Sequence, residues 1–271
     1  MHGVIPSVWS QDTAGPLTRT VADAALLLKA IAGYDVNDPI TANLPVPDYL
    51  TFLNGDISGM RIGVIKETME ASHLNPEVKA AVQEAIRQFT SLGAAVEEVS
   101  IPTVALSSVV NGVSGSDRTA LQWKNLMEAP HQYDIAARRF NLLPGLFPAV
   151  LHQRALQLRS LLRRDILDAC SHFDVLVSPY QATPPPLIED TRNPLASKEQ
   201  ALEEIKKFSF STMAPIAGIP ALCLPCGFTE DGLPIGLQVM AERFDETSVF
   251  RAAHAYEVST KWHTMRPPVG D

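Results

Sequence analysis

Two cysteines near the C-terminal end have the spacing of reactive or metal-binding thiols. Cys223 and Cys226 form a Cys-x-x-Cys pair, as redox-active thiols and half of a zinc site do. The pair lies in an apolar run that predicts a strand, where residues three apart point to opposite faces of the sheet. No second cysteine or histidine pair supplies the remaining zinc ligands. The sequence therefore favours two packed thiols, with a redox or zinc site as the alternative.

One stretch rich in glycine and serine, residues 111–117, could offer a serine nucleophile among backbone donors. It does not match the Gly-x-Ser-x-Gly elbow, because Ser116 stands where the second glycine should be. We interpret the stretch as a polar turn that opens a helix at Leu121, with the nucleophile as the alternative.

The other residue types suited to chemistry form no recognisable site. The seven histidines include no His-Glu-x-x-His pair, and no cluster has the spacing of metal ligands, so we expect no metal. The sequence contains neither a Gly-x-Gly-x-x-Gly loop nor a Walker lysine loop, so we expect no nucleotide cofactor. Several arginines are interpreted as solvated helix faces, with anion binding as the alternative. They are Arg138, Arg139, Arg154, Arg159, Arg163 and Arg164.

The elements of the first hundred residues form a strand, a helix and a second strand after an initial helix. Thr20 with Asp23 is typical of a helix start, and Gly33 of a helix end. Residues 61–65 predict a buried strand, Asn75-Pro76 starts a helix that ends near Gly93, and residues 95–99 predict a second strand. Such a unit implies two parallel strands covered by helices, which makes the predicted fold class α/β.

The rest of the chain is predicted to continue with helices and strands. The expected helices cover 121–127, 134–140, 149–169, 197–207 and 246–258, and the expected strands 174–178, 221–228 and 233–240. In the long helix, Leu151, Ala155 and Leu162 are among the residues expected to face inward. The last two strands flank a turn ending at Gly232, which predicts a β-hairpin. We find no internal repeat and no linker, so residues 1–271 are predicted to form a single domain.

Composition narrows the function classes further. The chain has 271 residues, 46% hydrophobic and 19% charged, which is typical of a globular protein. Its net charge of −8 argues against nucleic acid and anionic lipid as partners. No apolar run reaches the roughly 20 residues that cross a bilayer, and no export signal is visible. Three cysteines cannot form a disulfide framework, so we expect a cytoplasmic protein.

The order of several runs resembles one family. GVIP at 3–6 and SQDTAGPLTRTVADAA at 10–25 resemble the segment just downstream of the catalytic loop in amidase-signature enzymes. Further runs resemble the same family in the same order. They include AGYD at 32–35, GMRIGV at 59–64, AGIPA at 217–221, PCGF at 225–228 and GLPIGLQ at 232–238. The resemblance spans residues 3–268.

The resemblance implies α/β/α layers around a mixed β-sheet, incomplete at the N-terminal side. Family members carry a Ser-(cis-Ser)-Lys triad near a Gly-Gly-Ser-Ser-Gly-Gly-Ser-like loop, which this sequence lacks. The resemblance therefore implies that no catalytic residue lies in this chain and that the triad is expected upstream of Met1. In the intact family the lysine activates the serines, the nucleophilic serine attacks an amide carbonyl, and water resolves the acyl-enzyme.

The resemblance also implies which residues bind substrate. Gln11 and Asp12 are expected beside the catalytic loop. Positions that line the acyl pocket are matched by Arg139, Phe208, Ser211, Thr212 and Ile216. In the related amidotransferase A subunits an arginine and an aspartate grip glutamine, and Phe208 stands at the aspartate position. A phenyl ring cannot accept a hydrogen bond from an α-ammonium group, which favours an apolar or neutral amide substrate.

Two hypotheses follow from the sequence. The first is an amidase in which this chain supplies the pocket wall and the sheet, so that the chain alone is inactive. The alternative is a non-catalytic scaffold or subunit, resembling the A subunits of amidotransferases, that works through protein contacts. The expected partners are a small-molecule amide and either a second copy of the chain or an upstream complementing segment. Neither nucleic acid nor a membrane is expected.

Overall fold

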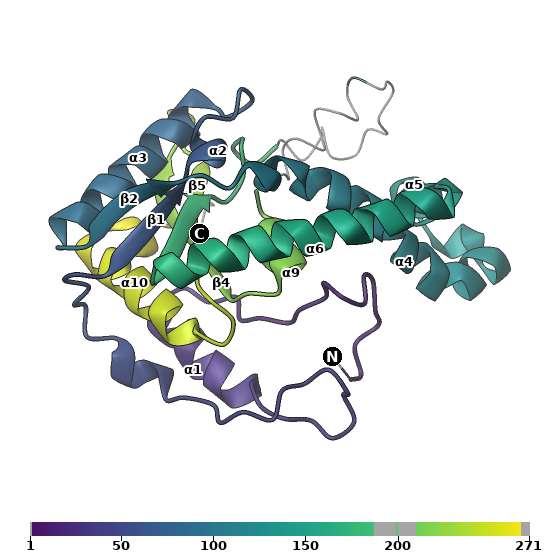
Figure 1. Ribbon diagram of the computed structural model, residues 1–271, viewed down its shortest axis with the longest axis horizontal. Helices are drawn as coiled ribbons and strands as arrows, with labels where there is room; N and C mark the ends of the chain where they lie inside the picture. The colour runs from purple at the N-terminus through teal and green to yellow at the C-terminus, as the bar shows by residue number, and fades with distance from the viewer. Residues whose placement is uncertain (1, 187–198, 200–209, 267–271) are drawn as a thin grey trace.

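The computed structural model describes residues 2–186, 199 and 210–266, and its centre is a five-stranded sheet (Figure 1). The strands are β1 (Arg61–Ile65), β2 (Ala95–Val99), β3 (Val175–Pro179), β4 (Ala221–Phe228) and β5 (Pro234–Met240). Their order is β2-β1-β3-β5-β4. β1 pairs in parallel with both β2 and β3, whereas β5 pairs antiparallel with β3 and β4. The sheet is therefore mixed, as the resemblance implied.

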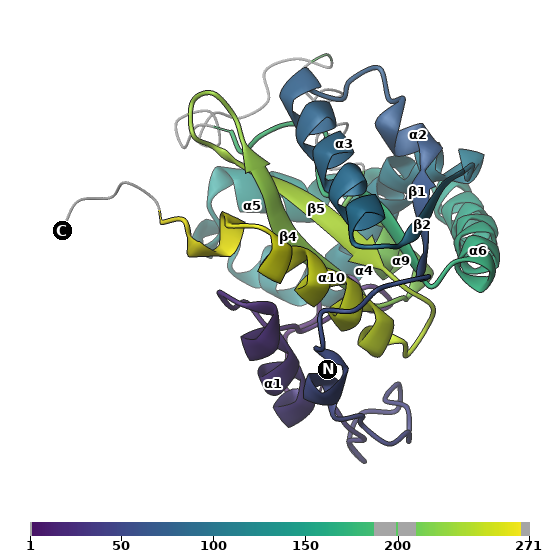
Figure 2. The same cartoon turned by 90° about the vertical axis from the view of Figure 1, so that its left-hand side faces the viewer.

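Helices cover both faces of this sheet. Within the described residues the helices are α1 (Val21–Ile31), α2 (Lys66–Met69), α3 (Pro76–Ser91), α4 (Ser107–Glu128), α5 (Ile135–Leu142), α6 (Ala149–His172), α9 (Met213–Ala217) and α10 (Glu246–Ser259). Short 3-10 helices occupy Tyr49–Phe52, Pro102–Leu106, Pro130–Gln132, η4 (Leu143–Leu146) and Trp262–Thr264. In Figure 2, α3 and α10 lie on one face, and α6 and α9 lie on the other.

The sheet separates two hydrophobic cores. Val175 and Val177 of β3 point into the core that α3 and α10 cover, whereas Leu176 between them points into the core under α6 and α9. This alternation follows from the two-residue period of a strand. All five residues of β3 are buried, as expected of the central strand. The α/β/α layering is confirmed.

Local signals explain why α3 begins and ends where it does. The Asn75 side chain accepts hydrogen bonds from the N–H groups of Glu77 and Val78, and Pro76 takes the first helical position. Gly93 follows the helix with a positive φ of 91°. The predicted helix is confirmed, as are the flanking strands and the C-terminal hairpin.

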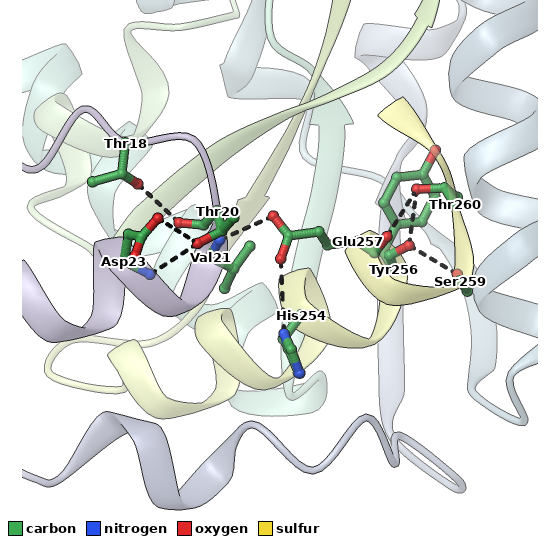
Figure 3. A network of polar contacts seen from close by, with 9 residues as sticks. All are labelled: Thr18, Thr20, Val21, Asp23, His254, Tyr256, Glu257, Ser259 and Thr260. Carbon is green, nitrogen blue, oxygen red and sulfur yellow. Dashed lines mark hydrogen bonds and ion pairs between the residues drawn. The ribbon is translucent and has the colours of Figure 1, made fainter. Parts of the chain in front are cut away.

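The start of α1 is tied to α10 by the network in Figure 3. The Thr20 hydroxyl caps α1 by accepting from the Asp23 N–H at 3.1 Å. The N–H of Val21 donates to Oε1 of Glu257 at 2.9 Å, and Oε2 of Glu257 lies 3.8 Å from Nδ1 of His254. Glu257 is buried, so this long-range bond holds the N-terminal helix on the outer side of α10.

The predicted turn at residues 111–117 is wrong, because these residues form part of α4. A Cβ on Gly115 would lie 2.9 Å from Cγ of Pro144, so glycine permits the close packing of α4 on η4. The hydroxyls of Ser114 and Ser116 donate to carbonyls one turn earlier, at 2.8 and 3.0 Å. Tertiary packing therefore outweighs the low helix propensity of this stretch.

One inward-facing residue of α6 was also predicted wrongly. Leu151 is 46% exposed, whereas Ala155 and Leu162 are buried as predicted. The reason is that the first turns of α6 extend away from the sheet beside α4 and α5 (Figure 1). The helix predicted at 197–207 lies outside the described residues, apart from residue 199. Within the described part of the chain, no helix is long and apolar enough to cross a membrane.

Candidate functional site

The predicted residues Gln11 and Asp12 belong to a loop formed by residues 3–12, the N-terminal loop. The Asp12 carboxylate accepts the N–H groups of Ser7 at 2.6 Å and Val8 at 3.0 Å. Both carboxylate oxygens are thus engaged in closing the loop. The side-chain nitrogen of Gln11 is buried and has no hydrogen-bond partner among the described residues. Gln11 therefore retains a donor that could serve another group.

Arg159 of α6 joins the N-terminal loop to α9. Its guanidinium donates to the Ser10 carbonyl at 2.6 Å, to the Ser10 hydroxyl, and to the Ile216 carbonyl at 3.2 Å. Burial lowers the pKa of Arg159, the neighbouring Arg163 lowers it further, and Asp117 opposes both effects. The interpretation of Arg159 as part of a solvated face is wrong. Its position four residues after the buried Ala155 was the sequence signal that could have placed it inward.

Arg118 of α4 joins the same loop to α5. Its Nε donates to the Ser7 hydroxyl at 2.9 Å, and one terminal nitrogen donates to the Phe140 carbonyl at 3.3 Å. The guanidinium also lies 3.7 Å from the centre of the Phe140 ring. Burial lowers the pKa of Arg118, against the opposing effect of Asp12. No pattern in the sequence indicated this contact.

The remaining predicted residues that the structure describes lie on α5, on α9 or directly before α9. Arg139 is half-buried on α5, next to Phe140. Ser211 and Thr212 precede α9, and Thr212 is buried. The Ile216 side chain is fully buried in the core under α6, so it is the Ile216 carbonyl that contacts Arg159. Phe208 lies outside the described residues.

The cysteines do not provide a reactive thiol pair. All three are free, and Cys226 is buried whereas Cys223 is exposed. Burial raises the pKa of the Cys170 and Cys226 thiols to about 12, so both stay protonated at neutral pH. Among the described residues, no group of three or more His, Cys, Asp or Glu side chains could hold a metal ion. The described cysteines therefore form neither a reactive thiol pair nor part of a metal site.

Comparison with known proteins identifies the family to which this chain belongs. The sequence profile of the Amidase family matches residues 1–250. The chain belongs to the amidase-signature family. The A subunit of glutamyl-tRNA(Gln) amidotransferase from Halalkalibacterium halodurans is 36% identical to it over 98% of this chain and 58% of the relative. The corresponding protein of Desulfatibacillum aliphaticivorans is 34% identical, over 98% of this chain and 59% of the relative.

Solved structures agree with the amidase-signature fold. The A subunit of glutamyl-tRNA(Gln) amidotransferase from Thermotoga maritima superposes with a TM-score of 0.74 at 29% identity, covering 92% of this chain and 53% of that protein. A peptide amidase crystallised with the inhibitor chymostatin gives 0.73 at 26% identity, covering 99% and 57%. The chain therefore spans somewhat more than half the length of the relatives it matches. The family is named for amide hydrolysis, and the solved relative at 26% identity is a peptide amidase.

Proposed function

We propose that this chain supplies the substrate-side wall of an amide-hydrolysing site whose serine and lysine residues come from a preceding segment. The supporting observation is the position of the N-terminal loop. The resemblance implies that this loop follows the catalytic loop, and Arg118 and Arg159 hold it between α5 and α9. Arg139 lies on α5, and Ser211 and Thr212 directly precede α9; these are residues matched to the acyl pocket.

The proposed reaction assigns the bond-making steps to the preceding segment. A neutral lysine takes the proton of the bridging serine, which takes the proton of the nucleophilic serine as that oxygen attacks the amide carbon. The C–N bond breaks, and the nitrogen leaves as ammonia or an amine after receiving a proton. Water then cleaves the acyl-enzyme to a carboxylic acid. The buried Gln11 amide donates to the catalytic loop or the substrate, and α5 and α9 hold the acyl group.

The test is an ammonia-release assay with and without a complementing segment. The segment is the part of the Halalkalibacterium halodurans relative that this chain does not match, co-expressed with it. We expect no ammonia above a buffer blank from phenylacetamide or glutamine with the chain alone, and release with the complemented pair. Turnover by the pure chain would refute the proposed absence of the nucleophile, and an inactive but stoichiometric pair would refute the proposed role in catalysis.

The substrate preference follows from Phe208. We propose that a neutral, apolar amide such as phenylacetamide is hydrolysed faster than glutamine, because a phenyl ring cannot accept a hydrogen bond from an α-ammonium group. Phe208→Asp should shift the preference toward glutamine in the complemented pair. An unchanged ratio of the two kcat/KM values would show that residue 208 does not determine the substrate preference.

A second candidate function is that of a protein resembling the A subunits of amidotransferases, which works through protein contacts. It is favoured by the names of the relatives at 33–36% identity, which are glutamyl-tRNA(Gln) amidotransferase A subunits. A stable complex with the other subunits of such an enzyme at nanomolar concentration, together with faster hydrolysis of glutamine than of phenylacetamide, would favour this candidate. The opposite substrate order without a complex would favour the general amidase.

A further inference from the structure

A cleft of about 410 Å³ lies between α4, η4 and the first turn of α6, on surfaces that the proposed reaction does not use. One part of its lining is polar and comes from Ser116, Asp117 and His152. Another part is aromatic, since Trp123 is 55% and Phe147 42% exposed. An open cleft that combines one acidic group with two exposed aromatic rings has the composition of a small-molecule site.

The hydrogen bonds of Ser116 determine which nitrogen of His152 bears its proton. The Ser116 hydroxyl has a single proton and donates it to the Val113 carbonyl at 3.0 Å. The Ser116 oxygen also lies 2.8 Å from Nδ1 of His152. Both contacts can be hydrogen bonds at the same time only if the hydroxyl donates to Val113 and Nδ1 of His152 donates to the Ser116 oxygen. The arrangement that satisfies both contacts therefore has the proton of the neutral His152 ring on Nδ1.

With this tautomer, two hydrogen-bond acceptors, Nε2 of His152 and Oδ1 of Asp117, lie side by side at the cleft. Nε2 of the neutral ring then carries a lone pair, and it lies 3.9 Å from Oδ1 of Asp117. The Asp117 and His152 side chains are 29% and 27% exposed, so both can be reached from solvent. Two acceptors at this separation are best satisfied by one group that donates to both. Arg159 interacts with Asp117 through charge, but its N–H groups donate to Ser10 and Ile216.

We propose that this cleft binds a primary ammonium group attached to an aromatic body. The ammonium donates to Nε2 of His152 and to the Asp117 carboxylate, and the ring lies against Trp123 and Phe147. A nucleophilic role for Ser116 is not favoured, because its hydroxyl is bonded within the helix and the neighbouring N–H groups belong to α4, leaving no donors for an oxyanion.

The test uses 2-phenylethylammonium as the probe, titrated into the full chain by isothermal calorimetry. The matched controls are 2-phenylethanol, which keeps the ring without the charge, and 3-phenylpropionate, which reverses the charge. We expect saturable binding of the ammonium with a Kd at least tenfold lower than that of 2-phenylethanol, and no binding of the anion. Equal binding of charged and neutral probes, or no saturation at millimolar concentration, would overturn the proposal.

Two variants locate the site. Asp117→Asn keeps the shape of the side chain and removes its charge, so affinity for the probe should fall at least tenfold. Glu128→Gln makes the same charge change at an exposed position near the end of α4 and should leave the Kd unchanged. An equal effect of both variants would show that the cleft is not the site. Because the assay measures binding and not turnover, its outcome is independent of the proposed amidase activity.

The tautomer of His152 can be measured first without the probe and then with it. ¹⁵N chemical shifts of His152 at a pH where the ring is neutral should show Nδ1 protonated and Nε2 bare. Addition of 2-phenylethylammonium should shift the Nε2 resonance, because this nitrogen becomes a hydrogen-bond acceptor. A ring protonated on Nε2 would remove the acceptor pair on which the proposal rests.

Discussion

At the scale of single residues, Arg159 holds the N-terminal loop on α9. Lysine keeps the charge but lacks the rigid planar fork with which the guanidinium donates to both Ser10 and Ile216. We expect Arg159→Lys to speed hydrogen exchange at the N–H groups of Gln11 and Asp12, which donate to the Val8 carbonyl inside the loop. Arg164→Lys, on the exposed side of α6, is the control and should leave this exchange unchanged. If the N–H groups of Gln11 and Asp12 exchange equally slowly in both variants, Arg159 does not hold the loop.

Glu67 is predicted to make stability depend on acid pH. Burial opposes its charge, but hydrogen bonds from the Ser100 hydroxyl at 2.6 Å and the Ile101 N–H at 2.8 Å outweigh burial and lower the pKa of Glu67. The pKa of an unfolded glutamate is about 4.3, so between the two pKa values the unfolded chain binds more protons than the folded chain. Glu67 therefore stabilises the fold fully above the pKa of the unfolded glutamate. This stabilisation is lost as the pH falls through the lower pKa that Glu67 has in the folded chain.

The measurement for Glu67 is the urea midpoint at several pH values between 3 and 6. We expect Glu67→Gln to flatten the loss of stability toward low pH relative to the unmodified chain. Glu70→Gln serves as the control, since Glu70 lies on the surface in a loose ion pair with Lys66 at 3.8 Å. If the urea midpoint of Glu67→Gln falls toward low pH as steeply as that of the unmodified chain, Glu67 does not cause this pH dependence.

At the scale of elements, two glycines of α4 are expected to respond in opposite directions to alanine. A Cβ at Gly115 would lie 2.9 Å from the rigid ring of Pro144, whereas one at Gly112 meets nothing within 4 Å. Gly115→Ala should therefore destabilise the fold by about 1–3 kcal/mol through overpacking. Gly112→Ala should stabilise it by about 0.5–1 kcal/mol, since alanine is the better helix former. Thermal unfolding of both variants measures this difference, and a shift of the same sign would refute the packing argument.

The same helix shows how far the sequence predicts these elements. Signals within a few residues, such as the Asn75 cap and the turn at Gly232, were sufficient for α3 and the hairpin. The course of α4 through residues 111–117 was missed, because the contact of Gly115 with Pro144 joins segments that are distant in sequence. The contacts of Arg118 and Arg159 with the N-terminal loop were missed for the same reason. The predicted site segments thus converge through contacts that no local pattern contains.

At the scale of the whole molecule, the two outer strands of the described sheet differ in character. β2 carries the glutamates Glu97 and Glu98, and such charges discourage pairing with another strand. β4 reads ALCLPCGF and has no charge, and it borders a largely apolar cleft lined by Tyr180, Cys223 and Pro225. Large apolar residues elsewhere, such as Leu17 and Leu146, are also exposed. The β4 side is therefore the expected site of association.

This difference predicts self-association of the chain when no partner is present. Light scattering after size-exclusion chromatography should show an average mass that rises with concentration. Cys223→Lys places a charge on the exposed side of β4 and should shift the chain toward the monomer, whereas Ala95→Lys adds the same charge to β2 and should not. If both variants remain as associated as the unmodified chain, the β4 edge is not the contact. A solely monomeric unmodified chain would contradict the prediction itself.

The position of β5 between β3 and β4 has a consequence for synthesis on the ribosome. β3 ends at Pro179, but its antiparallel neighbour β5 is complete only at Met240. At roughly 5–20 residues per second, the intervening segment takes on the order of 3–12 s to translate. During that interval the parallel strands can pair, while one side of the central strand β3 stays open. A nascent chain at this stage is a natural substrate for chaperones that bind unpaired strands.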